Sequence, residues 1–178
     1  SGISHMGYAL AGLVTGTKDG VASTILYLLI YVVMSIGSFV CILIMKRKNI
    51  YLENIRDLSG LSKNHPLVAL SFVVILFSLA GIPPLAGFFA KFYIFMAVVK
   101  VEFYTLAVIG LVTSVISAFY YLRIIKIIYF DPSQEKFDPI NSNGIKFSLV
   151  FSTLVILFYF LNPSIFTFFT NIATAAIK

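Results

Sequence analysis

Lys91 is the residue of this sequence whose type and position point most clearly to chemistry. It lies inside a long apolar stretch, and no other Asp, Glu, Lys or Arg occurs between Lys63 and Lys100. A lysine at the centre of a membrane helix costs roughly 2.5 to 3.5 kcal/mol on insertion scales, and such charges usually serve a function. An ammonium group removed from water can exchange a proton near neutral pH. The sequence therefore predicts proton transfer at Lys91, with a lysine that only holds a neighbouring chain as the alternative.

His5 is the second candidate for proton transfer. On a helix it shares one face with Ser1, Tyr8 and Gly12, because their spacings are four, three and four residues. A histidine on such a polar face could relay protons at physiological pH. The alternative is a packed, hydrogen-bonded core histidine. The other histidine, His65, directly precedes a proline at a loop–helix boundary, and we expect it at the surface.

Other polar residues form stripes that could hold water near Lys91, or could be small residues where helices pack closely. They are Tyr27, Tyr31, Ser35 and Ser38 in one block and Gly110, Ser114, Ser117 and Tyr121 in another. The sequence has no phosphate-binding loop, metal-ligand cluster or nucleophile–base arrangement. All seven acidic residues lie between the apolar blocks. We therefore expect no metal and no redox cofactor on this chain.

The composition indicates that these residues are carried by membrane helices. The chain has 178 residues, of which 60% are hydrophobic and 11% charged, against about 25% charged in soluble domains. The apolar blocks are continuous, whereas barrel strands would alternate apolar and polar residues. We predict an all-α integral membrane protein that forms a single domain over residues 1–178, with about five transmembrane helices. They are expected near 1–16, 21–45, 67–99, 103–128 and 146–170.

The first and third of these helices are unusual in length. Residues 1–16 would extend only ~24 Å, less than the ~30 Å hydrocarbon core, so we expect the beginning of this helix to be missing. The third would extend ~50 Å if unbroken. Pro83 and Pro84 cannot donate to the carbonyls of Leu79 and Ala80, which predicts a break between Gly81 and Pro84. Transporters place ion sites at such breaks.

The basic residues indicate the orientation of the helices. The net charge of +6 does not point to nucleic acid, because lysines and arginines lie between the apolar blocks. Alternating helices place Lys46, Arg47, Lys48, Arg56, Lys63, Arg123, Lys126, Lys136 and Lys146 on one side, and Lys18, Lys100 and Lys178 on the other. The first side is then the mitochondrial matrix or bacterial cytoplasm. Residues 46–66 form its longest connection. Within it, residues 49–62 are spaced for a partly amphipathic interfacial helix, or form a solvated loop.

Three segments resemble a known family. They are SGISHMGYALAGL (1–13), LAGIPPLAGFFAKFYIF (79–95) and SVISAFYYLRIIKIIYF (114–130). Their order and spacing are similar to the antiporter-like family of respiratory complex I, in particular subunit 2, the bacterial subunit N type. The resemblance implies that the chain is the C-terminal part of an antiporter-like helix bundle. Lys91 then falls on the family's terminal lysine of the broken helix, and His5 on a histidine of its central hydrophilic axis.

The resemblance also implies a function. The chain would be a proton-translocating subunit of NADH:ubiquinone reductase, with Lys91 and His5 transferring protons and no redox chemistry of its own. NADH, FMN, iron–sulfur clusters and ubiquinone would be bound by partner subunits. Other membrane-arm subunits would be its partners, including a chain that supplies the missing N-terminal helices, together with membrane lipids. The location would be the mitochondrial inner membrane or a bacterial plasma membrane.

Two other functions remain open from the sequence. One is a subunit of a multisubunit cation/proton antiporter or membrane-bound hydrogenase, since these relatives share the broken helix. The other is a non-conducting structural membrane subunit. The family's upstream glutamate, two upstream lysines and first broken helix have no counterpart in this chain. A self-contained proton path is therefore not expected.

Overall fold

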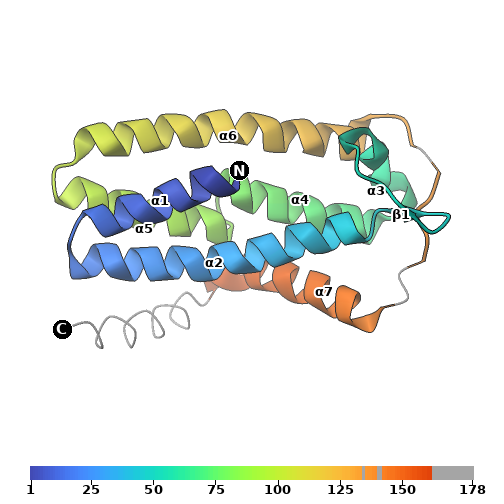
Figure 1. The fold of residues 1–178 in the computed structure, drawn as a ribbon, viewed down its shortest axis with the longest axis horizontal. Coiled ribbons are helices and arrows are strands. Elements are labelled where there is room, and N and C mark those ends of the chain that lie inside the picture. Colours follow the sequence, from blue (N-terminus) through green and yellow to red (C-terminus); the bar gives the residue numbers. More distant parts are fainter. Residues whose placement is uncertain (134, 140–141, 162–178) are drawn as a thin grey trace.

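Six helices of ten or more residues make up most of this computed structural model, which describes residues 1–133, 135–139 and 142–161 (Figure 1). They run roughly side by side along the long axis of the molecule. Their bounds are α1 (Gly2–Val14), α2 (Lys18–Leu43), α4 (Pro66–Ala80), α5 (Ala86–Lys100), α6 (Tyr104–Phe130) and α7 (Asn143–Phe158).

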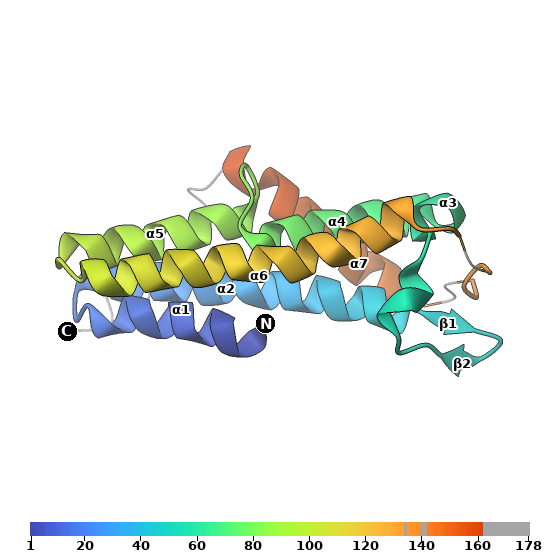
Figure 2. The ribbon, with the colours of Figure 1, turned by 90° about the horizontal axis from the view of Figure 1, so that it is seen from above.

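Three segments of the described chain are long and apolar enough to cross a membrane. They are α2, α6 and the segment Asn143–Leu161, in which a 3₁₀ turn (Tyr159–Leu161) extends α7. The shorter helices α4 and α5, of 15 residues each, follow one another along the bundle (Figure 2). Together they cover the predicted broken helix near residues 67–99. The predicted all-helical membrane fold is therefore confirmed.

The break between α4 and α5 follows from a glycine and two prolines. Gly81 ends α4 in the left-handed conformation, with a φ of 86°. The amides of Gly81 and Ile82 both donate to the Phe77 carbonyl, at 3.1 and 3.0 Å. The next two residues, Pro83 and Pro84, have no amide hydrogen with which to continue the helix. The break lies where the prolines predicted it, and extends to the residue before Ala86.

The two half-helices are fastened to each other across the break. The Gly87 amide at the start of α5 donates to Ser78 Oγ in the last turn of α4, at 2.9 Å. A Cβ on Gly87 would overlap the Ser78 carbonyl oxygen, so only glycine allows this approach. Ser78 Oγ also lies 3.1 Å from Met34 Sδ on α2. Ser78 therefore connects the end of α4 both to the start of α5 and to α2.

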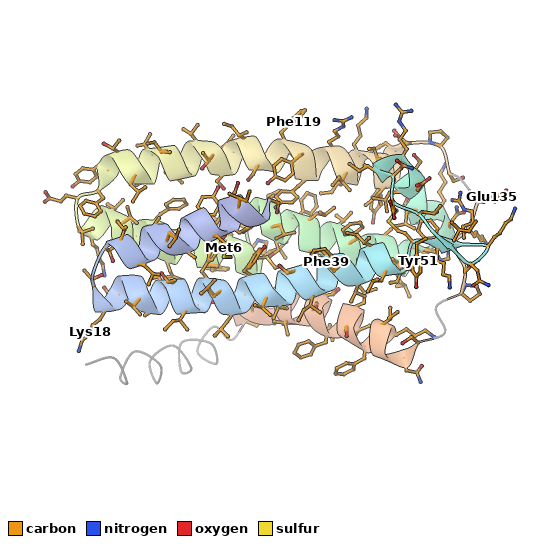
Figure 3. The ribbon with its side chains drawn as sticks, viewed as in Figure 1. Met6, Lys18, Phe39, Tyr51, Phe119 and Glu135 are labelled. Carbon is orange, nitrogen blue, oxygen red and sulfur yellow. The ribbon has the colours of Figure 1, made fainter. Side chains whose placement is uncertain are left out.

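The centre of the bundle is α2, which contacts α1, α4, α5 and α7. Its side chains Tyr27, Ile30 and Met34 have an exposed fraction of 1% or less. In contrast, α6 turns many large apolar side chains outward, and Phe119 points away from the bundle (Figure 3). Such an outer surface is suited to lipid or to further membrane helices.

The start of α2 shows why apolar blocks alone misplace helix ends. The apolar pattern predicted a helix from residue 21, whereas α2 begins at Lys18. Thr17 is its N-cap, and its hydroxyl accepts a hydrogen bond from the Gly20 amide at 3.0 Å. Asp19 in the first turn complements the positive helix end. The polar cap therefore adds a turn that the hydrophobic residues do not mark.

The connection between α2 and α4 differs from the prediction. Instead of an amphipathic helix over residues 49–62, it contains an antiparallel hairpin, β1 (Lys46–Arg47) and β2 (Ile50–Tyr51). A 3₁₀ turn (Ile55–Leu58) and the one-turn helix α3 (Leu61–Asn64) follow. The prediction of one helix was wrong, because Ile50–Tyr51 is a strand and Asn49 and Gly60 take left-handed φ angles of 66° and 64°. Two such residues cannot belong to a right-handed helix.

The hairpin is held by the connection between α6 and α7. The Asp138 carboxylate accepts hydrogen bonds from the amides of Lys48 (3.0 Å) and Asn49 (2.9 Å). These bonds hold the pKa of Asp138 below its usual value, and the bond from the Asn49 amide has the largest effect. The Phe137 amide donates to His65 Nε2 at 3.0 Å. His65, expected at the surface, is half-buried and joins the two connections.

The last helix begins earlier than expected. The apolar block predicted a start at residue 146, whereas α7 begins at Asn143 behind the N-cap Ser142. The Ser142 hydroxyl lies 3.5 Å from the Ile145 amide that it accepts from. The remainder of the predicted helix, from residue 162 to residue 170, lies outside the described residues.

Candidate functional site

The Lys91 side chain occupies the gap left by the broken helix. Its exposed fraction is 5%. Nζ donates to the carbonyl oxygens of Leu79 at 3.1 Å and Ala80 at 3.2 Å, and to Ser114 Oγ on α6 at 3.0 Å. Leu79 and Ala80 are the residues whose carbonyls lose their helical partners to the two prolines. The break therefore builds an acceptor site for an ammonium group.

The electrostatic surroundings of Lys91 are dipolar. The carbonyls at the end of α4 carry the negative partial charge of a helix C-terminus. The ion pairs found in the described part of the chain, Lys48 with Glu135 and Lys100 with Asp19, lie at the two ends of the bundle. The described residues thus give Lys91 carbonyl and hydroxyl partners and no carboxylate. This leaves the charge of a protonated Lys91 without a counter-ion from this part of the chain.

Gly81 leaves room for the lysine. A Cβ at this position would lie 3.2 Å from Lys91 Cδ and 3.3 Å from Nζ. Those distances are shorter than ordinary van der Waals contact. Gly81 therefore serves both the left-handed end of α4 and the space in which the ammonium group lies.

A cavity of about 310 Å³ lies between α5 and α6. Lys91, Gly81 and Ser114 contribute to its wall, and the rest is mostly apolar, including Phe88 and Phe95. Nζ also lies 5.2 Å from the centroid of the Tyr8 ring on α1. Lys91 is thus bordered by a cavity and by an aromatic face.

His5 is enclosed by tyrosines from two other helices. Its exposed fraction is 2%. Nδ1 lies 2.6 Å from the hydroxyl of Tyr27 on α2, and Nε2 lies 3.1 Å from the hydroxyl of Tyr121 on α6. The ring stacks on Tyr31, with centroids 4.8 Å apart. A neutral imidazole donates at one nitrogen and accepts at the other, so both nitrogens are satisfied.

The predicted polar stripes divide into residues at the site and residues that only pack. Tyr27, Tyr31 and Tyr121 contact His5, and Ser114 contacts Lys91. Ser38 instead donates to a carbonyl of its own helix at 2.9 Å.

The predicted α1 face divides in the same way. His5 and Tyr8 join the site, and Ser1 reaches Tyr121 with a 2.7 Å hydrogen bond. Gly12 serves packing, because a Cβ there would overlap Thr24 Oγ1 on α2. The sequence analysis assigned Tyr8 no separate role. Its distance of three residues from His5 put it on the right face, but its contact with Lys91 depends on how α1 and α5 pack.

No three His, Cys, Asp or Glu side chains come close enough to hold a metal ion in residues 1–133, 135–139 and 142–161. Cys41 is buried and is a free cysteine. The polar groups that converge in this part of the fold are therefore lysine, histidine, tyrosine and serine. Such groups can bind and pass protons.

Comparisons with known proteins identify similar chains. The chain is 60% identical over 164 residues to NADH-quinone oxidoreductase subunit N of Pelagibacter ubique. This match covers 92% of this chain and 35% of the relative. It is 54% identical to the same subunit of Parvibaculum lavamentivorans, covering 92% and 34%. The chain thus spans about a third of the length of these relatives.

Solved structures and a family model also match this chain. A chain of respiratory complex I from Thermus thermophilus with bound aureothin matches with a TM-score of 0.69 and 27% identity, covering 90% of this chain and 36% of that one. The Mrp complex from a Dietzia species shares the fold, with a TM-score of 0.82 and 23% identity over 96% of this chain and 40% of that one. A model of the NADH:quinone oxidoreductase/Mrp antiporter transmembrane family matches residues 1–117. The chain therefore belongs to the NADH:quinone oxidoreductase/Mrp antiporter transmembrane family.

Proposed function

We propose that this chain is the C-terminal part of an N-type membrane subunit of complex I. In this proposal the chain translocates protons, and Lys91 and His5 transfer them. The observation that carries the proposal is the position of Lys91 Nζ. It is buried at a helix break between two carbonyls and a hydroxyl. The relatives named NADH-quinone oxidoreductase subunit N support the identity of the complex.

The Lys91 site can accommodate both protonation states. A protonated lysine has three N–H donors, and three acceptors lie within 3.2 Å of Nζ. After loss of one proton, the amine has a lone pair and two N–H groups. The Ser114 hydroxyl can then turn and donate to that lone pair, because a hydroxyl both donates and accepts. Lys91 Nζ therefore keeps three hydrogen-bond partners in both states.

His5 is suited to relay a proton in the same region. A neutral His5 donates to one tyrosine hydroxyl and accepts from the other, and a protonated His5 would donate to both. Only the hydroxyl hydrogens need to rotate for this exchange. The Ser1 hydroxyl continues the hydrogen-bonded series beyond Tyr121. His5 therefore has the partners that a relay needs, without movement of the backbone.

The proposal extends to partners and location. Other complex I subunits would surround the chain and would bind NADH, FMN, iron–sulfur clusters and ubiquinone. The helices that complete an N-type subunit would come from another chain or from further sequence. The location would be an energy-coupling membrane, either the mitochondrial inner membrane or a bacterial plasma membrane. The bacterial origin of the relatives is consistent with the latter.

Lys91→Ala in the intact complex tests the function. We expect assembly to be retained, whereas NADH-driven proton pumping in sealed vesicles should fall severalfold. Lys100→Ala is the matched control, because Lys100 lies on the same helix but pairs with Asp19 at the surface, where ion pairs contribute little. Wild-type pumping by an assembled Lys91→Ala complex would refute the proposal.

A second candidate is a subunit of a cation/proton antiporter, which the likeness to the Mrp complex favours. The two functions differ in the partners that they require. If gentle purification from the native membrane recovers flavin and iron–sulfur proteins with the chain, complex I is supported. Recovery with antiporter subunits alone would replace it with the antiporter.

A further inference from the structure

The site consists of two hydrogen-bonded clusters. The Lys91 cluster contains Leu79, Ala80, Lys91 and Ser114. The His5 cluster contains Ser1, His5, Tyr27 and Tyr121. No hydrogen bond joins them in the part of the chain that the structure describes. A proton that moves between Lys91 and His5 therefore needs either water or the movement of a side chain.

Tyr8 contacts both clusters. The face of its ring is turned to Lys91, with Nζ 5.2 Å from the centroid. His5 meets the same ring edge-on, with centroids 6.1 Å apart. Tyr27 and Phe95 hold the ring by further edge-to-face contacts at 6.2 and 6.0 Å. With an exposed fraction of 5%, the Tyr8 ring is buried and contacts both clusters.

The contact between Lys91 and Tyr8 depends on charge. An aromatic face attracts an ammonium group through the ring quadrupole, and this attraction strengthens when the pair is removed from water. A neutral amine loses most of this attraction. Among the residues that the structure describes, the Tyr8 hydroxyl has one hydrogen-bond partner, Thr113 Oγ1, at the long distance of 3.4 Å, so the hydroxyl end is weakly held. The ring is therefore held most firmly when Lys91 is protonated.

We propose that Tyr8 is a gate between Lys91 and His5, which the protonated Lys91 holds closed. This proposal rests on the proposed function of Lys91. While the gate is closed, a protonated Lys91 can release its proton only toward the cavity between α5 and α6, whose wall it shares with Ser114. After that release the ring is free to turn, and water can reach the neutral amine from the His5 side. The incoming proton restores the charge and closes the gate. Each proton thus passes without a continuous water path.

The test uses three variants of the intact complex in sealed vesicles. Tyr8→Phe keeps the ring face, Tyr8→Leu keeps a branched apolar side chain without the ring face, and Tyr8→Ala removes both. The measurement is the passive decay of a pH gradient without NADH, together with quinone reduction and the amount of assembled complex. Tyr8→Phe should leave the decay rate within twofold of wild type. Tyr8→Leu and Tyr8→Ala should raise it severalfold while quinone reduction continues.

Two results would overturn the gate. If the assembled Leu and Ala variants hold a gradient as well as wild type, the ring does not block a proton path. If Tyr8→Phe leaks as fast as Tyr8→Ala, the hydroxyl is the group that matters. Either result leaves the role of Lys91 intact, because Lys91→Ala tests that role separately by the loss of pumping.

A second measurement of the same leak uses side chains that keep the ring, so that the packing needed for assembly is retained. Phenylalanines with increasing numbers of fluorine atoms, placed at position 8, keep the shape of the ring and weaken the attraction to a cation. The leak should rise stepwise with the number of fluorine atoms. An unchanged leak across the series would refute control of the gate by the charge of Lys91.

Discussion

Replacing Gly81 with alanine should disturb the Lys91 site in two separable ways. The backbone at this position has a φ of 86°, and a left-handed conformation costs a residue with a side chain roughly 1–2 kcal/mol. The new methyl group would also lie 3.3 Å from Lys91 Nζ. To relieve this contact, the Lys91 side chain must shift by a few tenths of an ångström, which changes the distances from Nζ to the carbonyls of Leu79 and Ala80.

The magnitude follows from these two effects. A hydrogen bond to a charged group contributes about 1.5–3 kcal/mol. If the displaced ammonium group loses one such bond in addition to the backbone cost, Gly81→Ala destabilises the protein by about 2.5–5 kcal/mol. Because the remaining bonds hold Lys91 in a shifted position, we also expect proton pumping to fall severalfold.

Gly16 provides the matched control. Its φ is also positive, at 63°, but a Cβ at this position would have no neighbour within 4 Å. Gly16→Ala should therefore cost only the backbone strain of roughly 1–2 kcal/mol and should keep normal pumping. The assays are the thermal unfolding of the purified complex and NADH-driven acidification of sealed vesicles. If the two variants are equally stable and pump equally well, the crowding of Lys91 by a side chain at position 81 is refuted.

Three further predictions concern single contacts. Ser114→Ala removes one of the three acceptors of Lys91; the complex should assemble but pump more slowly, as measured by the quench of a pH-sensitive dye. Asp138→Asn removes the charge that accepts from two amides of the hairpin turn. Because the pKa of Asp138 is lowered, this support is present at neutral pH and is lost only in acid, so the variant should show faster hydrogen exchange of the Asn49 amide at pH 7. Burial, and secondly the charge of Lys136, lower the pKa of His65, so its neutral form accepts the Phe137 amide. This support should be complete above the usual histidine pKa of about 6.5 and should weaken as the pH falls below it. Exchange of the Phe137 amide at pH 5.5, after correction for the intrinsic rate, would then exceed that at pH 7.5, and equal corrected rates would contradict this role of His65.

The sequence was sufficient to predict the helix break and what it leaves unpaired. Pro83 and Pro84 lack amide hydrogens, which identified the carbonyls of Leu79 and Ala80 as free acceptors. Lys91 was identified separately, as a charge within an apolar block. The sequence did not predict that these carbonyls accept from Lys91, because that contact requires α5 to turn its lysine back toward the end of α4.

Contacts between distant parts of the chain explain what the sequence did not predict. The left-handed turn at Lys48 and Asn49 is held by Asp138, 90 and 89 residues away along the chain. An amphipathic pattern over residues 49–62 contains no trace of that partner. Likewise, the spacing of Tyr8 and His5 gave their shared face, whereas the position of Tyr8 against Lys91 depends on the packing of α1 against α5.

The hydrogen bond between Ser78 and Gly87 restricts how α4 and α5 can move relative to each other. A broken membrane helix is often pictured as a hinge whose halves swing apart. Here the two halves are joined by a buried hydrogen bond at a point where even one added carbon would overlap a carbonyl oxygen. A swing would first have to open that bond in an environment without water to replace it. The angle between α4 and α5 is therefore expected to stay fixed. Changes of charge at Lys91 are expected to be transmitted by the rotation of hydroxyl groups, rings and water molecules while the helix axes stay in place.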